Sequence, residues 1–101
     1  MTEDKTIVSK REIKKSLKNN WKYINNSLEK EFKFDKFSSL IFFLKKTIKI
    51  MDQQNHHSDL NLDTKNKILK ISVTTHSKNS VTQADINFAD ALEEAWLEQN
   101  L

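Results

Sequence analysis

The amino-acid sequence predicts an α+β fold, a four-stranded antiparallel sheet with three helices packed on one face, in the chain order α-β-β-α-β-β-α. Three stretches carry apolar residues three and four positions apart, which is the spacing of one helical face. Between them lie paired stretches in which every second residue is apolar, with polar residues separating the members of each pair. Pairs of this kind are typical of antiparallel hairpins, so we expect an antiparallel sheet.

The first helix is expected over residues 9–20, where Ile13 and Leu17 form a narrow apolar stripe. Ser9 is a candidate for its N-cap. Asn19 and Asn20 can end it, because asparagine tolerates the left-handed conformation that glycine usually supplies.

A hairpin follows this helix. Its first strand is expected at residues 21–24, and Asn25-Asn26 supply the turn signal. In the second strand the apolar residues share one parity and the charged residues the other, as in a half-buried strand. The apolar residues are Leu28, Phe32 and Phe34.

The long second helix has the strongest periodic signal in the chain, and Asp35 is its expected cap. Its apolar stripe comprises Phe37, Leu40, Ile41, Leu44, Ile48 and Met51. Phe42, Phe43 and Ile50 lie off that stripe. This second apolar face indicates either contact with a partner subunit or a core that packs against both sides of the helix.

The second half of the chain repeats the pattern. A short strand is expected at residues 60–62, a turn at 63–67 and a clear strand at 69–76. The last helix has Phe88, Leu92 and Trp96 on its apolar stripe, together with Ala89 and Ala95. Thr82 and Asp85 resemble a capping box at its start.

The composition limits the class of protein. With 101 residues, we expect one domain over residues 1–101, with 1–8 as a flexible N-terminus. Glycine, proline and cysteine are all absent, which excludes collagen-like chains, disulfide frameworks and zinc–thiolate sites. The first residues lack the apolar core of a signal peptide, and the longest apolar run is too short to span a membrane. We therefore expect a soluble cytoplasmic protein without membrane contact.

Charge is unevenly distributed along the chain. Residues 1–50 hold 13 basic and 6 acidic residues, whereas residues 51–101 hold 4 and 8. A basic half can indicate nucleic-acid binding, but no recognised motif or interleaved aromatic residues accompany it here. We favour a lysine-rich surface and expect no nucleic-acid partner.

The histidines are the candidate chemical groups. His56 and His57 are adjacent at the end of the second helix, and His76 ends a strand. Side chains of neighbouring residues diverge, so a metal site is not expected. Imidazole suits general acid–base catalysis, and Asp52 shares a helical face with His56 if the helix runs that far. The alternative is that these are ordinary surface histidines at a helix end.

The spacing of these residues resembles the pterin-4a-carbinolamine dehydratase family. In that family an acid, three residues and His-His are followed by Thr-His and, eight residues later, by Asp; here these are Asp52, His56-His57, Thr75-His76 and Asp85. The segments LEKEFKF, FDKF and SVTQAD also match, so the resemblance runs from Trp21 to Trp96. The sequence departs from the family pattern at Ser58 (usually Pro), Leu60 (often Trp), Asn66 (usually aromatic) and Asn79-Ser80 (usually glycines).

The resemblance implies an enzyme that removes water from a 4a-hydroxy-tetrahydropterin during tetrahydrobiopterin recycling. It makes His56 and His76 the acid–base pair, while His57 holds or polarises the pterin. Asp52 and Asp85 orient imidazoles or bind pterin nitrogens, Thr74 and Thr75 offer backbone groups, and Leu60 lies near the ring.

The resemblance also implies that no metal or organic cofactor is needed and that the protein is a homodimer or homotetramer. Members of this fold also act without catalysis, as oligomeric partners that stabilise a transcription-factor dimer or assist the assembly of a large enzyme. That role is the alternative function.

Overall fold

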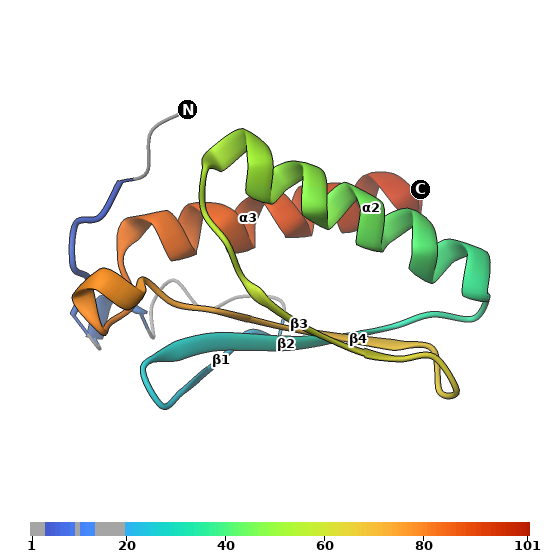
Figure 1. Ribbon diagram of the computed structural model, residues 1–101, viewed down its shortest axis with the longest axis horizontal. Coiled ribbons are helices and arrows are strands. Elements are labelled where there is room, and N and C mark those ends of the chain that lie inside the picture. The colour runs from blue at the N-terminus through green and yellow to red at the C-terminus, as the bar shows by residue number, and fades with distance from the viewer. Residues whose placement is uncertain (1–3, 10, 14–19) are drawn as a thin grey trace.

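The computed structural model describes residues 4–9, 11–13 and 20–101, and these form an α+β fold (Figure 1). The elements are β1 (Lys22–Ile24), β2 (Ser27–Lys33), α2 (Phe37–Gln54), β3 (Asp59–Asp63), β4 (Ile68–Val73), the 3-10 helix η1 (His76–Lys78) and α3 (Gln83–Gln99). The strands form one antiparallel sheet in the order β1-β2-β4-β3, and α2 and α3 cover one face of it. The predicted fold class is confirmed. Of the expected first helix, residues 9–20, residues 11–13 are helical, residues 9 and 20 are not, and residues 10 and 14–19 lie outside the described residues.

Asparagines make the predicted hairpin turn between β1 and β2. Asn25 and Asn26 have φ angles of 48° and 62°, so both are left-handed. A two-residue turn with positive φ at both positions matches the twist of the flanking strands, and asparagine accepts this conformation more readily than most residues. The turn sets the register in which Tyr23 faces Leu28.

The core lies between the sheet and the two long helices. Phe32 of β2 packs against Phe43 of α2 and Trp96 of α3, with ring centroids 4.8 and 5.1 Å apart. These contacts join both helices to the sheet through one aromatic cluster. The other fully buried side chains include Leu28, Leu40, Leu69, Ile71, Val73, Phe88 and Leu92.

The buried face of α2 differs from the predicted stripe. The buried residues are Leu40, Phe43, Thr47, Ile50 and Met51. Phe37 and Ile48 of the predicted stripe are 50% and 51% exposed. Both sets of residues have helical spacing, so periodicity identifies the helix without showing which apolar face meets the sheet. The start of α2 also differs, because its N-cap is Lys36 instead of Asp35.

The N-terminal segment is paired with the start of α3. Ile7 forms an antiparallel bridge with Thr82, and the N–H of Val8 donates to the carbonyl of Val81 at 3.3 Å. Over residues 4–8, part of the segment predicted to be flexible, the backbone makes these hydrogen bonds. Residues 1–3 lie outside the described part of the chain.

Candidate functional site

The end of α2 directs His56 away from the helix axis. Asn55 adopts a left-handed conformation (φ 50°, ψ 41°), and the N–H groups of Asn55 and His56 donate to the carbonyls of Asp52 and Met51. This left-handed C-cap satisfies carbonyls of the last turn and redirects the chain. The expectation that Asp52 and His56 share one helical face required α2 to continue through His56, and the helix ends at Gln54.

His56 is held by a carboxylate from α3. Its Nε2 atom lies 2.6 Å from Oδ1 of Asp85, and the two residues are only 4% and 0% exposed. The edge of the Phe88 ring packs near the imidazole, with centroids 6.2 Å apart. A ring fixed by burial and a short hydrogen bond has a defined orientation, as proton transfer requires.

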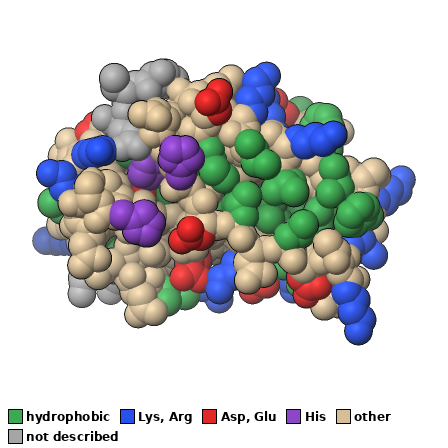
Figure 2. All heavy atoms as spheres, in the orientation of Figure 1, with side chains coloured by type: hydrophobic (Ala, Val, Ile, Leu, Met, Phe, Trp, Pro, Cys, Tyr) green, Lys and Arg blue, Asp and Glu red, His purple; other side chains and the backbone are tan. Residues whose placement is uncertain are grey.

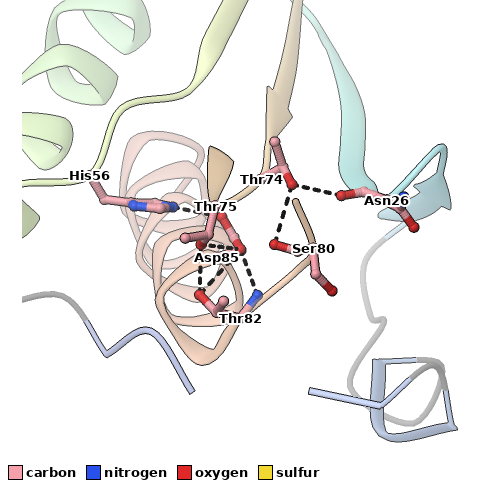
Figure 3. A network of polar contacts seen from close by, with 7 residues as sticks. All are labelled: Asn26, His56, Thr74, Thr75, Ser80, Thr82 and Asp85. Carbon is pink, nitrogen blue, oxygen red and sulfur yellow. Dashed lines mark hydrogen bonds and ion pairs between the residues drawn. The ribbon is translucent and has the colours of Figure 1, made fainter. Parts of the chain in front are cut away.

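The second oxygen of Asp85 caps its own helix. Oδ2 accepts hydrogen bonds from the N–H of Thr82 at 2.7 Å and from Oγ1 of Thr75 at 2.9 Å (Figure 3). The capping box predicted for Thr82 and Asp85 is present. A carboxylate in the first turn of a helix is favoured by the helix dipole. The capping and orienting roles are therefore not alternatives, because each oxygen of Asp85 serves one of them.

The three histidines line one pocket. His56, His57 and His76 surround a space of about 180 Å³ together with Lys5, Thr74, Thr75 and Ser77. Figure 2 shows the histidine side chains gathered on one face of the molecule. His57 and His76 are exposed, whereas His56 lies buried behind them. Pockets for drug-sized ligands measure roughly 300–1,000 Å³, so this one suits a small ring or one end of a larger ligand.

The residues that follow β4 contribute the hydroxyl-bearing residues of the pocket, Thr74, Thr75 and Ser77. Thr74 donates from Oγ1 to the carbonyl of Asn26 at 2.7 Å, and the Thr75 and Ser80 backbones exchange hydrogen bonds around η1. Asn79, which stands in place of a family glycine, is left-handed with φ 47°. This short loop therefore keeps the conformation that glycine would give, and it holds His76 beside the other imidazoles.

Three of the predicted substrate-binding residues, Asp52, Leu60 and Asp85, are not among the described pocket-lining residues. Leu60 lies in β3, where it packs against the core, and Asp52 is exposed in the last turn of α2. Asp85 contacts the pocket-lining residue His56 without lining the pocket itself. The pocket also contains Lys5 and Ser77, which the sequence did not single out. Ser77 follows a motif histidine, but nothing local in the sequence marks Lys5.

Other hollows are larger than the histidine pocket, at about 470 and 590 Å³. One lies over β1 and β2 and the other between α2 and α3, and no histidine lines either of them.

Within the described ranges, no three histidine, cysteine, aspartate or glutamate side chains lie close enough together to hold a metal ion. Across those ranges no helix combines the length and the hydropathy that a membrane crossing requires. The histidine pocket differs from the larger hollows because three imidazoles line it and one of them, His56, contacts the buried Asp85. These features make it the candidate site.

The sequence is similar to known proteins along most of its length. The profile of the family described as Pterin 4 alpha carbinolamine dehydratase matches residues 6–95. A Metallosphaera sedula protein with the provisional name pterin-4-alpha-carbinolamine dehydratase is 38% identical over 89 residues, which are 86% of this chain and 91% of that protein. A protein of the same provisional name from Prochlorococcus marinus is 31% identical over 90 residues, covering 87% and 93% of the two chains.

Two solved structures share the fold. A transcriptional coactivator/pterin dehydratase from Brucella melitensis superposes with a TM-score of 0.81 at 22% identity, covering 88% of this chain and 97% of that one. A pterin dehydratase-like protein identified as a RuBisCO assembly factor in the alpha-carboxysome gives a TM-score of 0.61 at 17% identity, covering 74% and 84%. At these identities the similarity is one of fold.

Proposed function

The chain belongs to the pterin 4 alpha carbinolamine dehydratase family, and we propose that it removes water from a 4a-hydroxy-tetrahydropterin to give the quinonoid dihydropterin. The observation that supports this proposal is the shared pocket, because three imidazoles from two separate segments line it. Imidazole can donate or accept a proton near neutral pH, and this dehydration needs one transfer of each kind.

The reaction breaks the bond between the carbinol carbon and its hydroxyl oxygen. Hydroxide is a poor leaving group, so a proton donor at that oxygen lets water leave instead. The neighbouring ring N–H then loses its proton to an acceptor, and its electron pair forms the new C=N bond. One proton is delivered and one is removed, so the enzyme ends with its total proton count unchanged.

We assign the donor role to His56 and the acceptor role to His76. The Asp85 carboxylate, 2.6 Å from the His56 ring, stabilises a positive charge on that imidazole, which suits a proton donor. His76 is exposed on the opposite chain segment and accepts the ring proton. His57 contacts the pterin and holds it between them. Thr74 and Thr75 contribute main-chain groups to the pterin site, while Asp52 and Leu60 lie outside the described lining of the pocket.

The proposal is tested by following the absorbance of a freshly generated pterin carbinolamine. The parent protein should accelerate its dehydration, and His56→Ala and His76→Ala should each lower kcat by about 100-fold, a typical contribution of one acid or base. Lys78→Met changes an exposed residue of η1 that is not among the pocket-lining residues, and it should keep the parent rate. If the parent does not exceed the spontaneous rate, the enzyme proposal is wrong.

A second candidate function is that of a non-catalytic oligomeric partner, and the apolar surface of α2 and β3 favours it. Phe37 and Ile48 of α2 and Leu62 of β3 are large, apolar and between 40% and 51% exposed. Figure 2 shows a continuous apolar area on the face where α2 and β3 lie in Figure 1. β3 is also an edge strand of the sheet, with an unpaired side. We propose that this surface makes the protein a homodimer or homotetramer.

Sedimentation velocity tests the proposed assembly. Ile48→Glu combined with Leu62→Lys should give a monomer, because both charges would be buried in the interface. Leu97→Lys changes a residue of α3 that is 63% exposed, and it should leave the assembly intact. A parent protein that sediments as a monomer at micromolar concentration would contradict the oligomer proposal.

The two candidate functions make different demands on the histidines. If the protein is an enzyme, His76→Ala should lower its rate and leave its assembly unchanged. If it is a non-catalytic partner, this substitution should change neither its assembly nor its function.

We propose that the enzyme works in the cytoplasm on a small-molecule pterin within tetrahydropterin recycling, and the absence of cysteine is compatible with that reducing compartment.

A further inference from the structure

The N-terminal segment forms one wall of the histidine pocket. Its main chain pairs with the start of α3, where the N–H groups of Gln83 and Ala84 donate to the carbonyls of Thr6 and Asp4 at 2.8 and 2.6 Å. Lys5 lies between these two acceptors and is one of the residues that line the pocket. The segment is therefore anchored on both sides of Lys5 by main-chain hydrogen bonds.

The same helical turn positions Lys5 and His56. The first N–H groups of a helix have no partner within it, and two of those in α3 are satisfied by the carbonyls of Asp4 and Thr6. Asp85, in that first turn, holds the ring of His56. Asp4 is itself fixed, because its Oδ1 accepts hydrogen bonds from Oγ1 and N–H of Thr6 at 2.7 and 3.1 Å. These two hydrogen bonds lower the pKa of Asp4, and the one from the Thr6 side chain is the larger cause.

Lys5 adds to the pocket a chemical property that its other described residues lack. The other lining residues are histidines, threonines and a serine, whereas Lys5 carries an amino group on a long side chain. An ammonium group has three donors and no acceptor, so it binds acceptor oxygens or anions. It is also a poor partner for proton exchange at neutral pH, where the histidines serve better.

We propose that Lys5 is a substrate-binding residue whose ammonium donates a hydrogen bond to an acceptor oxygen of the pterin, an inference that rests on the proposed function. Lys5 binds the substrate and its transition state alike, and the proton transfers remain with the histidines. The N-terminal segment thus contributes a substrate-binding residue to the site and also accepts hydrogen bonds from the first turn of α3.

The test compares Lys5→Met, Lys5→Arg and the control Lys78→Met. Loss of a charge-assisted hydrogen bond to the substrate should lower kcat/KM of Lys5→Met by about tenfold. Most of this change should be an increase in KM. Lys5→Arg keeps the charge and should recover most of that loss. The main-chain pairing of residues 4, 6 and 8 is available to all three variants, and thermal unfolding checks that each is folded before its kinetics are compared. An unchanged KM in Lys5→Met, or a loss confined to kcat, overturns the inference.

Direct binding separates this inference from the proposed reaction. Titration calorimetry with 7,8-dihydrobiopterin, a stable reduced pterin, should show about tenfold weaker binding to Lys5→Met than to the parent. If the parent binds this pterin through Lys5 but does not dehydrate the carbinolamine, the reaction is wrong and the role of Lys5 stands. If the parent dehydrates the carbinolamine and Lys5→Met binds equally well, the role of Lys5 alone is wrong. A parent that binds no reduced pterin overturns both.

Discussion

Nε2 of His56 lies 2.6 Å from Oδ1 of Asp85, although 29 positions separate the two residues in the sequence. Asp85 also caps α3 through its other oxygen. One buried carboxylate therefore links the end of α2, the end of β4 through Thr75, and the start of α3. Asp85 therefore bears on the stability of the fold and on the proposed reaction, and substitutions at it and at its partners can distinguish the two effects.

Replacing Asp85 with Asn should lower both stability and activity. The amide keeps the shape of the side chain but removes its charge, and it presents an NH₂ group to partners that need an acceptor. Breaking a buried ion pair from one side costs roughly 3–5 kcal/mol, so we expect a loss of that size in the free energy of unfolding. Urea denaturation measures it, with Glu94→Gln on an exposed site of the same helix as the control. If Asp85→Asn is as stable as the parent, the charge of Asp85 does not contribute to holding His56 in place.

The exposed histidines should behave differently from the buried one. His57→Ala and His76→Ala remove exposed rings, so we expect the free energy of unfolding to change by no more than about 0.5 kcal/mol. His56→Ala leaves Asp85 buried without its imidazole and should cost about 2–4 kcal/mol. Denaturation curves and initial rates on the same samples give both quantities. Equal stability losses in all three variants would mean that their effect on rate reflects folding.

The sequence predicts the fold well because its signals are local. Alternating residues in β2 and β4, asparagines in the hairpin turn and the Thr82–Asp85 pair are each readable within a few positions. The buried face of α2 cannot be read from the local sequence. Phe43 is buried because it packs against Phe32 of the sheet and Trp96 of α3, whereas Phe37 is half exposed. The spacing of the histidines predicts them as site residues through the family resemblance. Nothing local in the sequence predicts Lys5, because main-chain pairing between the N-terminal segment and α3 places it at the pocket.

Two adjacent phenylalanines of α2 test the corrected core. Phe43 is fully buried and its ring packs against Phe32 and Trp96, whereas Phe42 is 63% exposed. Phe43→Ala should lower the free energy of unfolding by roughly 3–5 kcal/mol because it leaves a cavity. Phe42→Ala serves as the matched control and should cost less than about 0.5 kcal/mol in the monomer. Urea denaturation at low protein concentration measures both, and similar losses in the two variants would contradict the burial of Phe43 beside an exposed Phe42.

Ser58, which stands where the family usually has proline, carries a buried hydroxyl. Its Oγ atom has no hydrogen-bond partner among the described residues. A buried polar atom without a partner costs free energy, so Ser58→Ala should raise the free energy of unfolding by about 1 kcal/mol. Thermal unfolding measured by circular dichroism tests this increase. A fall in the unfolding temperature would mean that the hydroxyl is satisfied in solution.

Asn66, another departure from the family, makes a local turn with Asp63. The carboxylate of Asp63 accepts hydrogen bonds from Nδ2 and N–H of Asn66 at 2.8 and 3.0 Å, and these lower the pKa of Asp63. The side-chain hydrogen bond is the larger cause, so Asn66→Ala should raise the pKa of Asp63 toward its ordinary value. Because the folded pKa is depressed, the stabilisation is present above the unfolded pKa of about 3.9 and is lost as pH falls through the folded value.

Carbon-detected NMR titration of the aspartate carboxyl groups follows this change directly. Asp4 provides an internal control, because Thr6 lowers its pKa independently of Asn66, and its titration should be the same in the parent and in Asn66→Ala. The N–H of residue 66 remains in the variant, so the pKa of Asp63 should rise only part of the way. If Asp63 titrates identically in both proteins, the turn is held by the backbone alone, and Asn66 replaces the family's aromatic residue without contributing this interaction.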